Sequence, residues 1–240
     1  MVLSNKKTSP IANKICKNWE SRGYNVPDAI VLEGPKAGGH LGWSYKRIAQ
    51  SNDFLKDYDL FDELLDPVLK VAERFGEIPI ITAGGIYTHE DILYALSRGA
   101  SAVQMGSRFA VTEESGFTNE TKQLIINSKK DGIIIADASQ GSPCIFPFRY
   151  IKNSPLILER TDEHFCICTG LFGAVGQNNT ELLGTKGFPI KCPEGYVLEK
   201  GKICPGRGNA DYNALTTIGS EGYRIDKVLS TSELMRELIN

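Results

Sequence analysis

No long apolar run and no strong charge imbalance appear in the sequence, and each absence excludes a class of protein. No uninterrupted apolar stretch approaches the ~20 residues of a membrane-spanning helix. Lysine and arginine total 27 and aspartate and glutamate 29, so the net charge of −2 does not indicate a nucleic-acid or anionic-membrane partner. Residues 1–14 (MVLSNKKTSPIANK) lack the apolar core of a secretory signal. We therefore expect a cytoplasmic protein with no membrane or nucleic-acid partner.

Cysteines are few, and their spacing matches no common metal site. Four of the six lie late in the chain, namely Cys166, Cys168, Cys192 and Cys204. Structural zinc sites usually draw on close pairs of the C-x₂₋₄-C type, and iron–sulfur spacings fit no better. We interpret these cysteines as free thiols and expect no metal site; a zinc site and a disulfide remain the alternatives.

Strand-like and helix-like patterns alternate along roughly the first 135 residues. Short apolar runs bounded by Gly or Pro predict buried strands, and apolar residues spaced by three and four predict amphipathic helices. The predicted strands are residues 29–32, 78–82, 102–105 and 133–135. The predicted helices are residues 11–22, 61–75, 88–97, 118–130 and 230–238. This alternation indicates βαβ units, a parallel sheet and an α/β fold.

Residues 165–222 differ in composition from the rest of the chain. They are rich in Gly, Pro, Asn and Cys and show no clear periodicity, which predicts loops. We therefore expect residues 1–160 to form one α/β unit. Residues 161–240 are expected to form a loop-rich extension that ends in the short helix at 230–238.

Three glycine-rich turns each follow a predicted strand. They are residues 34–40 (GPKAGGH), 83–85 (AGG) and 106–108 (GSR). Glycine permits close backbone approach, and successive backbone N–H groups at a strand end form an anion site. In (β/α)₈ barrels the loops after the last two strands commonly hold a phosphate. The alternative, that the glycines only permit tight turns, explains one turn better than three in series.

Two titratable side chains flank the first of these turns. His40 follows Gly38 and Gly39 just beyond a strand end, where a barrel displays catalytic side chains. Imidazole titrates near neutrality, so His40 could take a proton from a carbon acid or stabilise a developing anion; a structural loop histidine is the alternative. Glu33 ends the preceding strand, and it either orients a neighbouring group or forms an ion pair at the rim.

These turns resemble those of the nitronate monooxygenase (2-nitropropane dioxygenase-like) family. Residues 31–42 (VLEGPKAGGHLG), 78–86 (IPIITAGGI) and 102–109 (AVQMGSRF) occur in that family's order and rough spacing. The second motif is common to many phosphate-binding barrels, whereas the first and third together are specific. Smaller likenesses are residues 112–114 (TEE), Ser142 and Pro143 with Arg149, and residues 222–227 (GYRIDK).

The resemblance implies a (β/α)₈ TIM barrel that binds FMN at the C-terminal mouth of its strands. Gly38 and Gly39 would pass close to the flavin, and His40 would be the catalytic residue that faces the substrate. The FMN phosphate would bind at Gly84, Gly85, Gly106 and Ser107, with Gln104 and Met105 nearby. Ser107 stands where the family often has threonine, and both supply a hydroxyl. The implied reaction is flavin-dependent oxidation of an alkyl nitronate with O₂.

The chain departs from the family in its number of strands. A complete barrel has eight strands and needs ~250 residues, yet only about 28 residues precede the strand at 29–32. We interpret residues 1–5 as the end of the fifth strand, so the chain resembles the C-terminal half of a barrel. Exposed sheet edges would then favour a homo-oligomer or a complementary half-barrel as partner.

Three other functions fit parts of this pattern. A flavin-dependent enoyl-(acyl-carrier-protein) reductase has a similar Gly-Gly-His turn and would need a reduced nicotinamide donor. A non-catalytic fragment or split-barrel subunit would explain the missing strands. A phosphate-binding isomerase or synthase barrel would explain the turns at Gly84 and Gly106 but not the Gly-Gly-His segment.

Overall fold

The computed structural model describes residues 2–5, 8–136, 147–154 and 215–240. The late cysteines Cys166, Cys168, Cys192 and Cys204, and the Ser142–Pro143 pair, lie outside these ranges. Within them, no helix combines the length and the apolar character that a bilayer crossing requires.

A four-stranded parallel sheet forms the centre of the described structure, in the order β1–β2–β4–β5. Its strands are β1 (Val2–Asn5), β2 (Ala29–Glu33), β4 (Ile80–Ala83) and β5 (Ala102–Gln104). Glu33 lies opposite Ala83, and Ala83 lies opposite Gln104, so the carboxyl ends of the last three strands are level. The predicted parallel α/β arrangement of these strands is confirmed.

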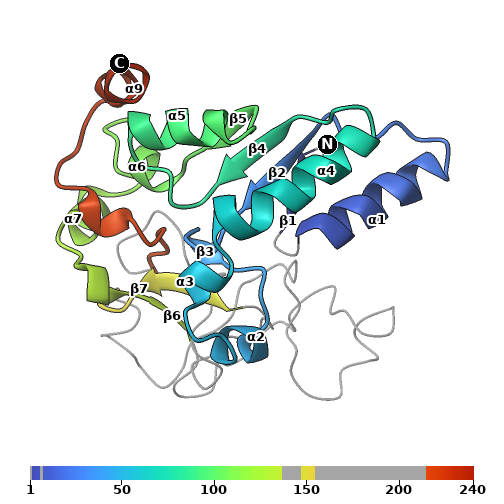
Figure 1. Ribbon diagram of the computed structural model, residues 1–240. Coiled ribbons are helices and arrows are strands. Elements are labelled where there is room, and N and C mark those ends of the chain that lie inside the picture. The colour runs from blue at the N-terminus through green and yellow to red at the C-terminus, as the bar shows by residue number, and fades with distance from the viewer. Residues whose placement is uncertain (1, 6–7, 137–146, 155–214) are drawn as a thin grey trace, which may run out of the picture.

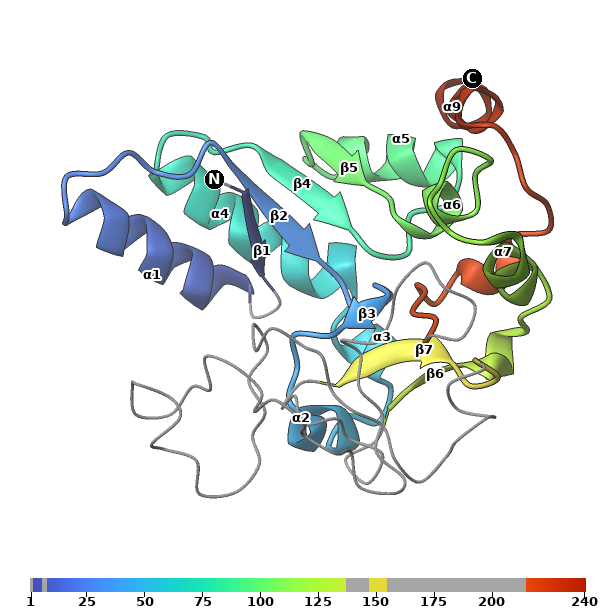
Figure 2. The ribbon, with the colours of Figure 1, turned by 180° about the vertical axis from the view of Figure 1, so that it is seen from behind.

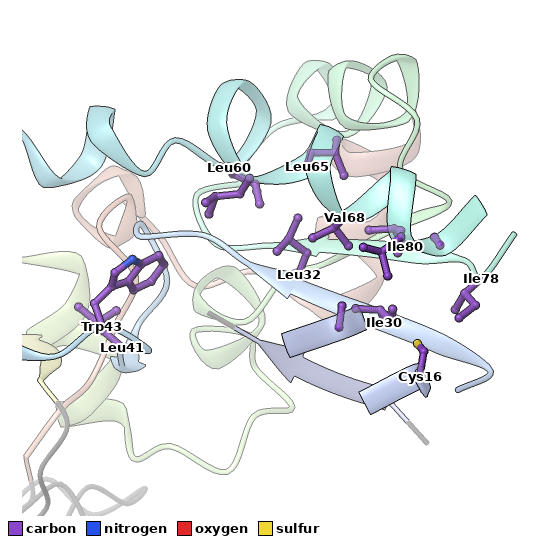
Figure 3. Close-up of a cluster of buried hydrophobic side chains, with 14 residues drawn as sticks. Cys16, Ile30, Leu32, Leu41, Trp43, Leu60, Leu65, Val68, Ile78 and Ile80 are labelled. Atoms are coloured by element: carbon purple, nitrogen blue, oxygen red, sulfur yellow. The ribbon is translucent and has the colours of Figure 1, made fainter. Parts of the chain in front are cut away.

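Helices cover one face of this sheet (Figures 1 and 2). They are α1 (Thr8–Glu20), the π-helical turn η1 (Leu60–Leu65) with α4 (Asp66–Arg74), and α5 (His89–Ser97). Ile30, Leu32 and Ile80 of the sheet pack against Leu65 and Val68 in a common buried cluster (Figure 3). Alternation along each strand therefore points Glu33 and Ala83 to the opposite face.

A second sheet was not foreseen from the sequence. It is antiparallel in the order β3–β7–β6, with β3 (Gly39–His40), β7 (Phe148–Ile151) and β6 (Ile133–Ile135). The strand predicted at 133–135 exists, but it does not extend the parallel sheet as strict alternation predicted. The reason is β7, a fully buried strand that pairs with both β3 and β6.

Local capping signals explain several of the helix starts. Thr88 and Asp91 form a capping box at α5, and Ser230 and Glu233 form another at α9 (Thr231–Ile239). Helix α7 (Asn119–Ile126) ends earlier than predicted, and the 3₁₀ turn η2 (Lys130–Gly132) follows it. The remaining short helices are α2 (Tyr45–Ala49), α3 (Phe54–Asp57), α6 (Ser107–Ala110) and η4 (Gly222–Arg224).

Residues 215–240 pack against the rest of the described chain. Ile218 and Ile225 share a buried cluster with Val111, Ile125 and Ile151. Helix α9 lies against α5 and α6, and the Leu238 carbonyl lies 2.9 Å from Nδ1 of His89. The C-terminal residues are thereby brought beside the turns that follow β4 and β5.

Candidate functional site

A cavity of about 350 Å³ lies at the carboxyl ends of β2, β4 and β5. This is the edge of a parallel sheet at which α/β proteins commonly bind ligands. The predicted site residues in its wall are Gly38, Gly84, Gly85, Gln104, Met105, Gly106 and Ser107. The structure thus brings residues from all three glycine-rich turns around one space.

The first turn is pressed against the C-terminal segment. A methyl group on Gly38 would lie 2.4 Å from the carbonyl carbon of Ile218 and 2.5 Å from the amide nitrogen of Gly219. Both atoms belong to the backbone, so no side-chain movement relieves the clash. Gly39 has a φ of 70°, in the region that glycine adopts readily. The close approach of two backbones therefore requires glycine at position 38.

The second and third turns form a concave backbone surface. Gly84 and Gly85 have φ values of 92° and 89°, a backbone conformation that glycine adopts readily and other residues rarely do. Gly106 has open space where a side chain would stand. Oγ of Ser107 accepts a hydrogen bond of 3.0 Å from the Gly219 amide, and its own hydrogen remains available to donate.

Charges of both signs occur in the cavity wall. The carbon chain of Lys36 runs over Gly85, where it would lie within 2.6 Å of a methyl group on that glycine. The Arg108 guanidinium donates to the Tyr87 carbonyl at 3.2 Å, lies 4.7 Å from the Tyr87 ring centroid and pairs with Glu237 of α9. That ion pair holds the pKa of the Glu237 carboxyl below its usual value. Arg108 thus ties the second and third glycine-rich turns to α9.

His40 lies next to the cavity wall, in β3. The residue is half-buried, its Nε2 atom is shielded from solvent, and its ring packs at 6.1 Å, centroid to centroid, against Phe148 of β7. Gly38 lies in the wall, whereas Gly39 and His40 follow it into the second sheet. The second sheet therefore positions the histidine at one side of the first turn.

A buried arginine lies behind the same turn. Arg149 of β7 exposes 3% of its surface, and its guanidinium donates a hydrogen bond to the Ala37 carbonyl. Burial lowers the pKa of Arg149 to about 10, and the negative charge of Glu221 opposes that effect. The sequence pointed to Arg149 only as a family likeness and gave it no role in the site.

Several wall residues were missed by reasoning from the sequence. Thr217, Ile218, Gly219 and Glu221 line the cavity, although residues 165–222 were predicted to be a loop-rich extension. The available signal was Gly219, one of several glycines in this irregular stretch. No group of three or more His, Cys, Asp or Glu side chains suited to a metal occurs in the part of the chain that the structure describes.

The family model and the curated relatives agree on one family. The family model for nitronate monooxygenase matches residues 6–240. A probable nitronate monooxygenase of Staphylococcus haemolyticus is 33% identical over 114 residues, which are 48% of this chain and 30% of that protein. A probable nitronate monooxygenase of Staphylococcus aureus strain Newman is also 33% identical over 114 residues, again 48% of this chain and 30% of that protein. The matched stretch thus spans less than a third of these curated relatives.

Two solved structures share the fold. FabK from Thermotoga maritima superposes with a TM-score of 0.54 at 19% identity, over 99% of this chain and 59% of that one. A nitroalkane oxidase from Streptomyces ansochromogenes gives a TM-score of 0.54 at 21% identity, over 99% of this chain and 55% of that one. At these identities the likeness concerns the fold alone.

Proposed function

This chain belongs to the nitronate monooxygenase family of FMN-dependent oxidoreductases, and we propose that its cavity binds FMN for the oxidation of alkyl nitronates with O₂. The observation that carries the proposal is the meeting of three glycine turns around one cavity at the carboxyl ends of parallel strands. The cavity volume of about 350 Å³ falls in the ~300–1,000 Å³ range of small-molecule sites.

The residues present fit the cofactor. Gly84, Gly85 and Gly106 place backbone without side chains of its own in the cavity wall, where a phosphate could approach it, and the Ser107 hydroxyl adds a donor. Gln104 ends β5 and Met105 follows it in the cavity wall, and Gly38 would lie by the flavin. Bound FMN would supply the electron-accepting chemistry, while the protein binds and orients the reactants.

His40 is the proposed catalytic residue, which takes a proton from a carbon acid or stabilises the anion that develops on the substrate. Replacing His40 by Asn removes a titratable nitrogen but keeps a polar side chain. We expect His40→Asn to retain FMN and to lose ~10²–10⁴-fold in nitronate turnover, the usual contribution of a general acid or base. His89→Asn is the matched control, because His89 contacts the Leu238 carbonyl of α9 and does not line the cavity. Full activity of His40→Asn would show that the catalytic assignment is wrong.

The direct test of the cofactor proposal is an absorbance spectrum of the purified chain. FMN is added and the sample is then desalted. Retained bands near ~370 and ~450 nm are those of oxidised protein-bound flavin. Reduction of that flavin by NADH or NADPH would favour the alternative, an enoyl-(acyl-carrier-protein) reductase, whereas turnover of nitronates with O₂ uptake would favour the present proposal. Sugar-phosphate binding without flavin would favour an isomerase or synthase barrel.

A second candidate is a half-barrel that acts only with its complement. Among the described strands, β1 and β5 each pair on one side only, so the sheet is open. Ala102 and Gln104 of β5 are exposed, and Leu93 and Leu96 of α5 are 52% and 43% exposed. Closure of a (β/α)₈ barrel would cover these groups.

Light scattering tests the half-barrel candidate. A chain that is monomeric alone, and that gains flavin binding when joined to the N-terminal part of a family member, would support a complementary half-barrel. A stable homo-oligomer that retains FMN would instead show that a second copy of the chain covers the open edges. A monomer that retains FMN by itself would contradict the need for any complement.

A further inference from the structure

The buried guanidinium of Arg149 has no role in the site proposed so far. It lies on β7, whose residue Arg149 pairs with Gly39 of β3. Its hydrogen-bond acceptor, the Ala37 carbonyl, is 112 residues away in the chain. Burying a cation is costly unless it is compensated, and the carboxylate of Glu221 supplies an opposite charge nearby. The free-energy cost of burying this cation behind a turn in the cavity wall suggests that Arg149 has a role there.

The peptide bond between Ala37 and Gly38 links this arginine to the cavity. The atoms of a trans peptide lie in one plane, with the C=O and the N–H pointing in opposite directions. Ala37 and Gly38 belong to the cavity wall, whereas Arg149 does not. By accepting from Arg149, the Ala37 carbonyl is held toward β7. The Gly38 N–H is thereby turned away from β7. Within the described residues, it donates to no protein acceptor.

A glycine makes this peptide easier to reorient. A flip of the Ala37–Gly38 peptide rotates ψ of Ala37 and φ of Gly38, and Gly38 can adopt φ values of either sign because it has no Cβ. A flipped peptide would present the Ala37 carbonyl to the cavity in place of the Gly38 N–H. The hydrogen bond from Arg149 opposes this flip, and the guanidinium cannot lose its proton near neutral pH.

We propose that Arg149 is a positioning residue that locks the Ala37–Gly38 peptide, so that the Gly38 N–H donates a hydrogen bond to an acceptor atom of the flavin ring. The inference rests on the proposed function, since it takes FMN as the ligand. Arg149 does not line the cavity, and it acts only through the backbone of the turn. The Ala37 N–H, which lies against Gly84, belongs to the preceding peptide and is held by the Gly34 carbonyl. We therefore expect loss of the Arg149 hydrogen bond to act at the Gly38 N–H and not at the phosphate end.

Two probes separate these two ends of the site. The dissociation constant of FMN is measured from the flavin fluorescence. That of inorganic phosphate is measured by its displacement of bound FMN. Arg149→Met removes the donor, and Arg149→Lys keeps the charge but loses the planar fork. The control is Lys152→Gln, which removes an exposed positive charge one residue after β7. We expect Arg149→Met to weaken FMN about tenfold, the upper value for one hydrogen bond, with phosphate binding and the control unchanged.

The outcomes distinguish this inference from its premise. Unchanged FMN binding, or equal weakening of FMN and phosphate, would overturn the positioning role. If the wild-type chain binds no FMN, the proposed function fails, and the Gly38 amide signal of the ligand-free protein still tests the inference. The NMR signal of this amide should shift in Arg149→Lys and stay in place in Lys152→Gln. Arg149→Lys keeps a buried cation, so it serves if Arg149→Met does not fold. An unshifted signal would refute the lock.

Discussion

Replacing Gly38 by alanine tests the close contact between the first turn and the C-terminal segment. The added methyl group would lie 2.4, 2.5 and 2.8 Å from three backbone atoms of Ile218 and Gly219. Carbon atoms in contact prefer ~3.5–4.0 Å, so one backbone must move by about 1 Å. Overpacking of this kind costs about 1–3 kcal/mol. Loss of the hydrogen bond from Gly219 to Ser107 would add about 0.5–1.5 kcal/mol.

Two further glycines are matched controls for the same substitution. A methyl group on Gly106 meets nothing within 4 Å, and its φ of −118° suits alanine, so Gly106→Ala should change the free energy of unfolding by less than about 0.5 kcal/mol. A methyl group on Gly39 also has room, but the φ of 70° should cost about 1–2 kcal/mol. The expected order of destabilisation is Gly38→Ala, then Gly39→Ala, then Gly106→Ala.

Urea unfolding measures this order. With a slope near the upper end of the usual ~1–3 kcal/mol/M, Gly38→Ala should lower the midpoint by about 1 M. The displaced segment also lines the cavity, so this variant should lose FMN after desalting. If Gly38→Ala and Gly106→Ala unfold at the same urea concentration, the packing of Ile218 and Gly219 on the first turn is not as the structure has it.

Two more predictions concern the C-terminal segment. Ser107→Ala should lose the hydrogen bond from Gly219, destabilise the fold by about 0.5–1.5 kcal/mol and weaken phosphate binding. Ser107→Thr, which keeps the hydroxyl, should do neither, and equal behaviour of the two variants would contradict this role. The Glu114 carboxylate accepts hydrogen bonds of 2.8 to 3.0 Å from the amide and hydroxyl of Thr231, and the amide bonds above all hold its pKa below the usual 4.5. A lowered folded pKa contributes stability above the unfolded value, and this is lost as pH falls through the folded value. Thermal unfolding should therefore show Glu114→Gln less stable than the wild type at about pH 7, with the difference vanishing well below pH ~4; a constant difference would argue against this linkage.

The alternating strands and helices could be predicted because their signals are local. Apolar periodicity, Gly and Pro punctuation and capping residues such as Thr88 and Ser230 all act within a few residues of the element they define. The strands at 29–32, 78–82 and 102–105 follow from such patterns, and the structure confirms them. The three glycine turns were identified for the same reason, since each directly follows a strand.

The pairing of distant segments could not be read from these local patterns. Residues 133–135 look the same whether they pair in parallel with β5 or antiparallel with β7, because one apolar run satisfies either sheet. Gly219 meets Ser107, and Arg149 meets Ala37, each across 112 residues. No periodicity links such residues; their contact depends on how the two sheets and the C-terminal segment pack. Local sequence therefore specified the elements and turns of the site, while long-range packing set which backbone atoms face its cavity.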